Sequence, residues 1–307
     1  MSADSPARAP WPEFKAALDA EDFRPSRRYG QNFLLDENTV RAIVKDSGVG
    51  PEDRVLEVGT GCGFLTVHLA AAVGELWTVE VDQRLARVAT PFIEPYTNTR
   101  LIEGDVLAGK HELAAEVEAC LPQSGSWYLV SNLPYSISGP ILAILAARPC
   151  APVSMTVLVQ KEVAERLAAE PATRAWGPLS LGIQLAYEPK IVRTVGPGSF
   201  WPRPRVDSAV IRLDARADAA PLEERVRVVA LARKLFERRR QSLGRVLGDY
   251  LQGRERAQAV LAEMGLDPGI RAETLDLAAW LSLTERVNFD LEPLSGKEGG
   301  ASAAPEG

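Results

Sequence analysis

The sequence has few of the residues on which several common kinds of functional site depend. Its 307 residues include only three cysteines and two histidines, namely Cys62, Cys120, Cys150, His68 and His111. The cysteines are too few and too far apart for a disulfide framework or a zinc site. With so few histidines, we expect neither a histidine-based catalytic triad nor a metal centre.

Long apolar runs are also missing. No stretch approaches the roughly 20 apolar residues of a membrane-spanning helix, and residues 1–12 hold no apolar signal-peptide core. We therefore expect no membrane contact and a cytoplasmic location. Residues 1–24 are rich in Pro, Ala and Asp and are expected to form a flexible leader. The tail at 291–307 is rich in Gly, Ser and Ala and is expected to be disordered.

An excess of positive charge is missing as well. The chain has 35 Lys and Arg against 41 Asp and Glu, a formal net charge of −6. That balance alone argues against a nucleic-acid partner, but the arginines are unevenly distributed. Arg203 and Arg205 lie in a proline-rich stretch, and Arg238, Arg239 and Arg240 are consecutive. Such a cluster is either a solvated helix face or a surface that binds phosphates.

The sequence does contain a long alternation of short apolar runs and amphipathic stretches. It predicts strands at 55–58, 76–81, 100–103, 127–130 and 154–159. It predicts helices after Asp36 and at 64–73, 84–93, 111–121, 139–147 and 162–169. Strands alternating with helices indicate an α/β fold with a mostly parallel sheet. The segments 191–195 and 206–213 predict a late hairpin that completes this sheet.

The pattern changes after Asp214, where the strand signal stops. Residues 215–220 resemble a linker, and the stretch beyond them has helical periodicity. We therefore expect an α/β domain over residues 25–214 and a small helical domain over 215–290.

Candidate binding residues stand at the ends of successive predicted strands. The run from Glu57 to Gly63 ends the first strand in a glycine-rich turn, which lets a ligand approach the backbone closely. Glu80 ends the second strand and suits the two ribose hydroxyls of an adenosine. Asp105 follows the third and suits an adenine amino group. The glycines of the turn are spaced G-x-G-x-G, which favours S-adenosylmethionine over a dinucleotide bound through its pyrophosphate.

The fourth strand runs into the turn Asn132-Leu133-Pro134-Tyr135. Its amide, its backbone carbonyl and its flat ring suit an exocyclic amino group on a planar heterocycle. Such a turn by itself could equally be an ordinary β-turn. Its position beside three other candidate residues at strand ends favours a binding site.

Several longer stretches resemble the rRNA adenine N6-dimethyltransferases of the KsgA/RsmA type. The resemblance covers about residues 25 to 285 and is most specific at Phe200–Val210. The matching stretches are residues 31–34, 57–63, 132–140, 160–164, 200–210 and 236–243. Thr60 stands where these proteins usually have Pro, and Gln241-Ser242 where they usually have Lys-Thr.

The resemblance implies a fold, a reaction and a set of site residues. The fold is a class I, Rossmann-like methyltransferase domain with a mostly parallel seven-stranded sheet, followed by a helical C-terminal domain. The reaction is S-adenosylmethionine-dependent dimethylation of N6 of two adjacent adenosines near the 3′ end of small-subunit rRNA. The residues matched to cofactor binding are Asn32, Leu34, Gly59, Glu80, Asp105 and Asn132. Those matched to the target adenine are Asn132, Pro134, Tyr135 and Phe200.

The resemblance also implies a partner, namely small-subunit rRNA within a pre-ribosomal small subunit, bound by a monomer. An acidic protein must concentrate its positive charge where RNA passes, so we expect Arg203, Arg205, Arg238, Arg239 and Arg240 to contact phosphates.

Three alternatives stay open from the sequence. A large-subunit rRNA adenine methyltransferase has a similar first domain, and some relatives bind nucleic acid as transcription factors without needing methyl transfer. A nicotinamide-dependent oxidoreductase fits less well, because the chain lacks the third-glycine spacing and any hydride-relay residue.

Overall fold

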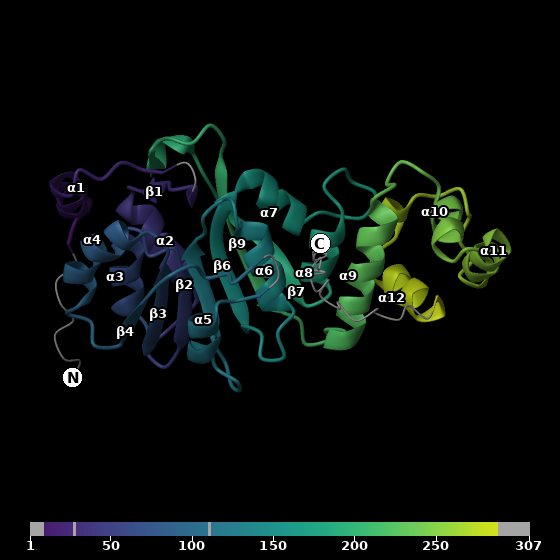
Figure 1. Cartoon of the computed structure of the whole chain (residues 1–307), viewed down its shortest axis with the longest axis horizontal. Coiled ribbons are helices and arrows are strands. Elements are labelled where there is room, and N and C mark those ends of the chain that lie inside the picture. The colour runs from purple at the N-terminus through teal and green to yellow at the C-terminus, as the bar shows by residue number, and fades with distance from the viewer. Residues whose placement is uncertain (1–8, 27–28, 110–111, 288–307) are drawn as a thin grey trace, which may run out of the picture.

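The structure, a computed structural model, describes residues 9–26, 29–109 and 112–287. Its main feature is a seven-stranded sheet with helices on both faces, and a group of helices lies beyond one edge of that sheet (Figure 1). From edge to edge the strands are β4 (Thr99–Glu103), β3 (Glu75–Glu80), β2 (Arg54–Val58), β5 (Tyr128–Asn132), β6 (Ser154–Gln160), β9 (Ser208–Ala215) and β7 (Tyr187–Val195).

The sheet is mostly parallel, as the sequence predicts. Strands β4, β3, β2, β5 and β6 run in one direction, while β9 is antiparallel to both β6 and β7. The predicted late hairpin is confirmed as β7 and β9. The carboxyl ends of the five parallel strands therefore meet at one edge, where α/β proteins bind ligands.

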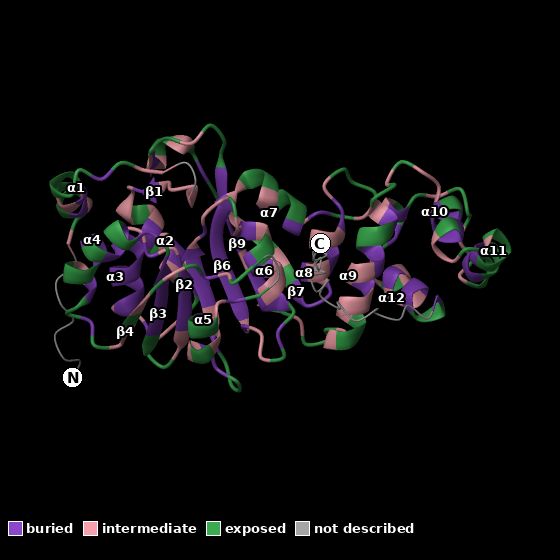
Figure 2. Cartoon of the chain, viewed as in Figure 1, coloured by how far each residue is buried: buried purple, intermediate pink, exposed green. Residues whose placement is uncertain are grey.

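Helices cover the two faces of the sheet in two sets. One face carries α2 (Glu37–Ser47), α3 (Phe64–Ala70) and α4 (Gln83–Ile93), and α1 (Trp11–Ala20) packs on α3 and α4. The other carries α5 (Ala115–Cys120), α6 (Ser138–Ala146), α7 (Lys161–Leu167) and α8 (Pro178–Gln184). Side chains alternate between the faces along each strand, so Val55 packs with the first set and Leu56 with the second. Figure 2 shows the strands buried between the helices.

The helices beyond β7 form a third core. They are α9 (Leu222–Phe236), α10 (Leu243–Tyr250), α11 (Arg254–Glu263) and α12 (Leu277–Arg286), with a short 3₁₀ turn at Ala272–Thr274 between the last two. Another 3₁₀ turn, Pro197–Ser199, lies between β7 and the next strand in the chain. Trp280 and Leu231 lie at the centre of this core. The expected α/β fold, with a mostly parallel seven-stranded sheet followed by a helical C-terminal part, is confirmed.

The expected flexible leader at 1–24 is wrong for part of its length. Residues 11–20 form α1, because Phe14 and Leu18 lie four residues apart and both are fully buried. Phe14 stacks on Phe92, and Trp11 meets Phe64 edge-on. Residues 1–8 and the predicted disordered tail at 291–307 lie outside the described residues.

The division into domains at residue 214 stays a prediction. Helix α8 packs into two cores, since Ile183 belongs to the core of the sheet while Leu181 and Leu185 belong to the helical core. The predicted helix at 111–121 is shorter than expected, because its described helical part begins at Ala115.

Candidate active site

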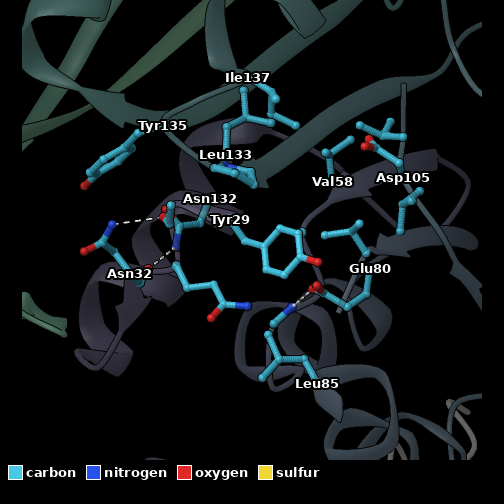
Figure 3. A pocket seen from close by; sticks show the side chains of 18 of the residues that line it. Tyr29, Asn32, Val58, Glu80, Leu85, Asp105, Asn132, Leu133, Tyr135 and Ile137 are labelled. Atoms are coloured by element: carbon cyan, nitrogen blue, oxygen red, sulfur yellow. Dashed lines mark hydrogen bonds between the residues drawn. The ribbon is translucent and has the colours of Figure 1, made fainter. Parts of the chain in front are cut away.

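The turn after β5 is held in place by backbone hydrogen bonds. The amide of Leu133 donates to the carbonyl of Leu158 at 3.1 Å, and the amide of Ile137 donates to the carbonyl of Pro134 at 3.1 Å. Leu133 is buried, while Asn132, Pro134 and Tyr135 line an open pocket at the carboxyl edge of the sheet (Figure 3). A carbonyl has two lone pairs, so the carbonyl of Pro134 can still accept a second hydrogen bond.

The side-chain amide of Asn132 has a defined orientation. Its Nδ2 donates to the backbone carbonyl of Asn32 at 3.1 Å, and the Asn32 side chain in turn donates to the carbonyl of Gly30 at 3.0 Å. Because a carbonyl can only accept, the atom that faces it must be Nδ2. The Oδ1 atom of Asn132 has no hydrogen-bond partner in the described part of the chain. It therefore remains an available acceptor.

The glycine turn after β2 packs directly against the turn that contains Asn132. Gly59 has a φ of 89°, in the left-handed region, and its amide donates to the carbonyl of Val79 at 2.8 Å. A side chain at this position would lie 3.3 Å from Pro134 Cδ. Glycine therefore lets the two turns meet and form one wall.

Glu80 ends β3 and points into the same pocket. Its Oε2 accepts from the amide of Gly61 at 2.7 Å, and its Oε1 accepts from the amide of Asp82 at 2.9 Å. Burial raises the pKa of Glu80 to about 7, and the two backbone N–H groups oppose this shift. Each oxygen keeps a free lone pair, which suits a pair of neighbouring hydroxyl groups.

A buried polar network lies beneath the glycine turn. Glu57 Oε2 accepts from the hydroxyls of Thr66 and Thr78, each at 2.7 Å, and Thr78 also meets the hydroxyl of Thr60 at 2.6 Å. Burial raises the pKa of Glu57 to about 8, against the opposing effect of these two hydrogen bonds. The Thr60 that departs from the pattern of the resembled family is thus one member of this network.

Asp105 completes the far end of the pocket, on the same side as Glu80 and opposite Tyr135 (Figure 3). Its Oδ1 accepts from the amide of Leu107 at 3.0 Å, which fixes the carboxylate at the start of the loop. The pocket is open to solvent and lies at the carboxyl edge of the sheet, where α/β proteins bind ligands. Seven of the nine residues predicted to bind cofactor or target base line it together: Asn32, Gly59, Glu80, Asp105, Asn132, Pro134 and Tyr135.

Sequence reasoning missed part of the pocket wall. Tyr29 lies between Glu80 and Asn132 in Figure 3, and Gln31, Leu85 and Ile137 also line the pocket. Gln31 donates to Asp82 at 3.1 Å, which ties the N-terminal segment to the start of α4. Gln31 belongs to one of the stretches that resemble the family. Its segment has no helix or strand periodicity, so the sequence did not indicate that it packs against strands that come later in the chain.

Two predicted site residues do not reach the pocket surface. Leu34, in β1 (Phe33–Leu34), pairs with Phe200, in β8 (Phe200–Trp201), and both side chains are buried. The amide of Leu35 also donates to the carbonyl of Ser199 at 2.8 Å. Their contacts with cofactor and target base stay predictions.

The predicted RNA-binding arginines differ in how they are held. Arg238 pairs with Asp249 at 2.5 Å. Arg239 forms an ion pair with Glu273 and donates to the carbonyls of Arg174 at 2.8 Å and Thr173 at 2.9 Å. These bonds give Arg239 a structural role at the end of α9.

Three of the predicted arginines are exposed and have no ion pair or hydrogen bond among the residues described. Arg203 and Arg205 lie on the segment between β8 and β9, and Arg240 lies beyond α9. Arg239 and Arg240 also line a shallow hollow with Arg174, Arg271 and Glu273.

Metal-binding clusters and membrane-spanning helices are both absent from the part of the chain that the structure describes. Its His, Cys, Asp and Glu side chains include no group of three or more placed to hold a metal ion. No helix in the described ranges has the length and apolarity needed to cross a membrane.

Comparison with known proteins decides the family. The family model for ribosomal RNA adenine dimethylases matches residues 22–288. The chain belongs to this family. It is 36% identical over 288 residues to ribosomal RNA small subunit methyltransferase A of Geobacillus kaustophilus, covering 92% of this chain and 96% of that protein. The protein of the same name from Clostridium botulinum is 34% identical over 279 residues, covering 89% and 98%.

Solved structures agree on the fold of this ribosomal RNA adenine dimethylase. A dimethyladenosine transferase from Plasmodium falciparum superimposes with a TM-score of 0.69 at 23% identity, covering 83% of this chain and 97% of the other. The 23S rRNA methyltransferase ErmE gives a TM-score of 0.62 at 25% identity, covering 83% and 99%. The alternative hypothesis of a nicotinamide-dependent oxidoreductase is therefore wrong. The protein is an S-adenosylmethionine-dependent methyltransferase.

The pocket of this dimethylase fits S-adenosylmethionine. Glu80 offers two acceptor oxygens for the ribose hydroxyls, and Asp105 offers an acceptor at the same end for the adenine amino group. Because Gly59 has no side chain, the space beside Pro134 stays open. When bound, the cofactor supplies an electrophilic methyl group.

Proposed function

We propose that this protein transfers methyl groups from S-adenosylmethionine to N6 of two adjacent adenosines near the 3′ end of small-subunit rRNA. The observation that carries the proposal is the orientation of the Asn132 amide. Because Nδ2 is held by the carbonyl of Asn32, Oδ1 is the atom left to accept from an amino group. An adenine N6 carries two hydrogens, and the carbonyl of Pro134 supplies the second acceptor.

These two acceptors would change the reactivity of the target nitrogen. The lone pair of an adenine N6 is delocalised into the ring, which makes this nitrogen a poor nucleophile. Hydrogen bonds to Asn132 Oδ1 and to the carbonyl of Pro134 favour a pyramidal nitrogen with a localised lone pair. They also stabilise the positive charge that develops on N6, as preorganised dipoles do in other enzymes. The proton is then lost to water, so no general base is needed.

The base must leave its stack to enter the pocket. Tyr135 lies at the end of the pocket away from Glu80 and can stack on the base, an interaction worth roughly 1–3 kcal/mol. Phe200 is a second candidate for the opposite face of the base. Its burial beside Leu34 means that the segment between β7 and β9 would have to move for it to contribute.

We also propose that the substrate is an assembling small subunit, bound by a monomer of this protein in the cytoplasm. The small-subunit relatives support this target, since the two reported above match this chain at 36% and 34% identity, against 25% for the 23S enzyme. Methylation of large-subunit RNA is the competing outcome of the test below.

The proposal is tested by labelled methyl transfer to three substrates in parallel: immature small subunits, free large-subunit RNA and DNA. We expect dimethyladenosine in small-subunit rRNA only. Asn132→Ala should lower single-turnover rates by about 10²–10³, the scale for one preorganised electrostatic contact. Label confined to large-subunit RNA, or an Asn132→Ala rate within threefold of wild type, would contradict the proposal.

A matched control for this variant is Asn98→Ala. The Asn98 side chain donates to the carbonyls of Ala70 and Val73, at 2.9 and 2.7 Å, and does not line the pocket. Its loss should lower the melting temperature but leave the methylation rate of the folded protein intact. The pair of variants thus separates catalysis from stability.

A further inference from the structure

Ser208 is the first residue of β9. It belongs to the stretch Phe200–Val210, of which only Phe200, Arg203 and Arg205 have so far been given a predicted role. It pairs with Gln160 at the end of β6 and with Val195 at the end of β7. Its side chain is fully buried, and its hydroxyl lies 2.6 Å from the hydroxyl of Tyr135. This hydrogen bond joins two stretches that are more than 70 residues apart in the chain.

A buried serine in a sheet needs a partner, because an unsatisfied hydroxyl away from water costs free energy. In the described structure, Tyr135 is the side chain that provides this partner for Ser208. Burial raises the pKa of the Tyr135 hydroxyl, so the phenol keeps its proton and the pair stays neutral.

The bond to Ser208 controls a rotation that the backbone bonds leave free. The carbonyl of Tyr135 accepts from Ser138 Oγ at 3.2 Å, which fixes the main chain. The side chain could still occupy another staggered position about its Cα–Cβ bond, which would swing the whole ring and its hydroxyl to another place. A hydrogen bond at the far end of the ring restricts where the side chain points, and with it the surface presented to the pocket.

We propose that Ser208 is a positioning residue, which holds the Tyr135 ring where the target base must stack. This inference rests on the proposed function, because it concerns how the same site receives its substrate. Ser208 does not line the pocket, so it acts only through Tyr135. The sequence stretch that most specifically resembles the family thereby gains a role in the active site.

The test removes the hydrogen bond from each side. Ser208→Ala and Tyr135→Phe both delete one hydroxyl, and Tyr135→Phe keeps the ring. We expect each variant to slow single-turnover methylation of small-subunit rRNA by about five- to tenfold, the range for one neutral hydrogen bond. Cofactor affinity should not change. The double variant should be no slower than either single one, because both changes remove the same hydrogen bond.

Tyr187→Phe is the matched control. The Tyr187 hydroxyl is also buried and donates to the carbonyl of Pro152 at 2.7 Å, but it lies at the opposite end of β7 from Val195. Its loss should lower the melting temperature and leave the methylation rate unchanged. A slowing of the same size in this control would mean that the effect is one of general stability, and would overturn the inference.

The remaining outcomes are also decisive. If the wild type is active and Ser208→Ala methylates at the same rate, the role of Ser208 is overturned but the proposed function is not. Rate losses that multiply in the double variant overturn it too, because the two hydroxyls would then act independently. A wild type that methylates no small-subunit rRNA overturns the proposed function, and this inference with it.

Discussion

At the scale of single residues, burial determines the chemistry of two carboxyl groups near the glycine turn. Glu57 is buried in a hydroxyl network and Glu80 faces the pocket, yet burial raises the pKa of both, to about 8 and about 7. For Glu80 the consequence is functional. Only the ionised form offers free lone pairs on both oxygens, because a proton occupies one of them in the acid.

Cofactor affinity should therefore depend on pH through Glu80. The folded-state pKa is raised, so the acceptor form is present above about pH 7 and is lost as the pH falls below it. The predicted quantity is the ratio of the wild-type affinity for S-adenosylmethionine to that of Glu80→Gln. This ratio should fall about five- to tenfold when the pH is lowered from 8 to 6. Calorimetry at both pH values measures this ratio. The ratio also cancels any titration of the cofactor's own amino group, and a constant ratio would contradict the prediction.

The same scale explains which site residues could be predicted. Gly59, Glu80, Asp105 and Asn132 each lie at or just after the carboxyl end of a parallel strand, and these ends share one edge of the sheet. Their convergence thus follows from local pattern alone. Tyr29 was missed because it precedes the sheet in the chain, in a segment that reaches the pocket only through tertiary contacts such as Gln31 with Asp82.

At the scale of elements, the sequence predicted the strands and helices whose periodicity is strong. Helix α2 begins after Asp36, whose side chain accepts from the amide of Asn38 at 3.1 Å, and it ends at Gly48 with a φ of 71°. These are signals that a sequence carries. The pairing of β1 with β8 could not be predicted, because two-residue strands have no periodicity and their partners lie far apart in the chain.

Helix α1 was missed for a different reason. Its surroundings are rich in Pro and Ala, which suggested a flexible leader, but the spacing of Phe14 and Leu18 supplies one apolar face. That face is buried against the rings of Phe64 and Phe92. A composition average therefore concealed a short amphipathic helix.

The contribution of α1 to stability can be measured with one substitution. Phe14→Ala should lower the free energy of unfolding by about 3–5 kcal/mol, as expected for a fully buried phenylalanine. Glu13→Ala, on the exposed side of the same helix, should change it by no more than about 0.5 kcal/mol. Urea unfolding followed by circular dichroism gives both values. Equal midpoints for the two variants would mean that residues 11–20 do not pack as described.

At the scale of the whole molecule, a protein with a formal net charge of −6 has to bind a polyanion. The expected RNA-binding arginines divide into two groups. Arg238 and Arg239 already bind acidic or carbonyl partners, whereas Arg203, Arg205 and Arg240 have no such partner among the described residues. An arginine without an internal partner can bind a phosphate without first breaking an ion pair or hydrogen bond within the protein.

The two groups should therefore respond differently to removal of charge. Changing Arg203, Arg205 and Arg240 to Gln should lower RNA affinity and flatten the plot of log affinity against log salt, by about 0.7–0.9 for each phosphate that is no longer neutralised. These changes should barely alter the melting temperature. Changing Arg238 and Arg239 to Gln should lower the melting temperature, because Arg239 links α9 to Glu273 and to the carbonyls of residues 173 and 174. Filter binding to small subunits at several salt concentrations measures the slopes. If the second pair flattens the slope and the first three do not, the RNA path lies along the end of α9 and away from the segment between β8 and β9.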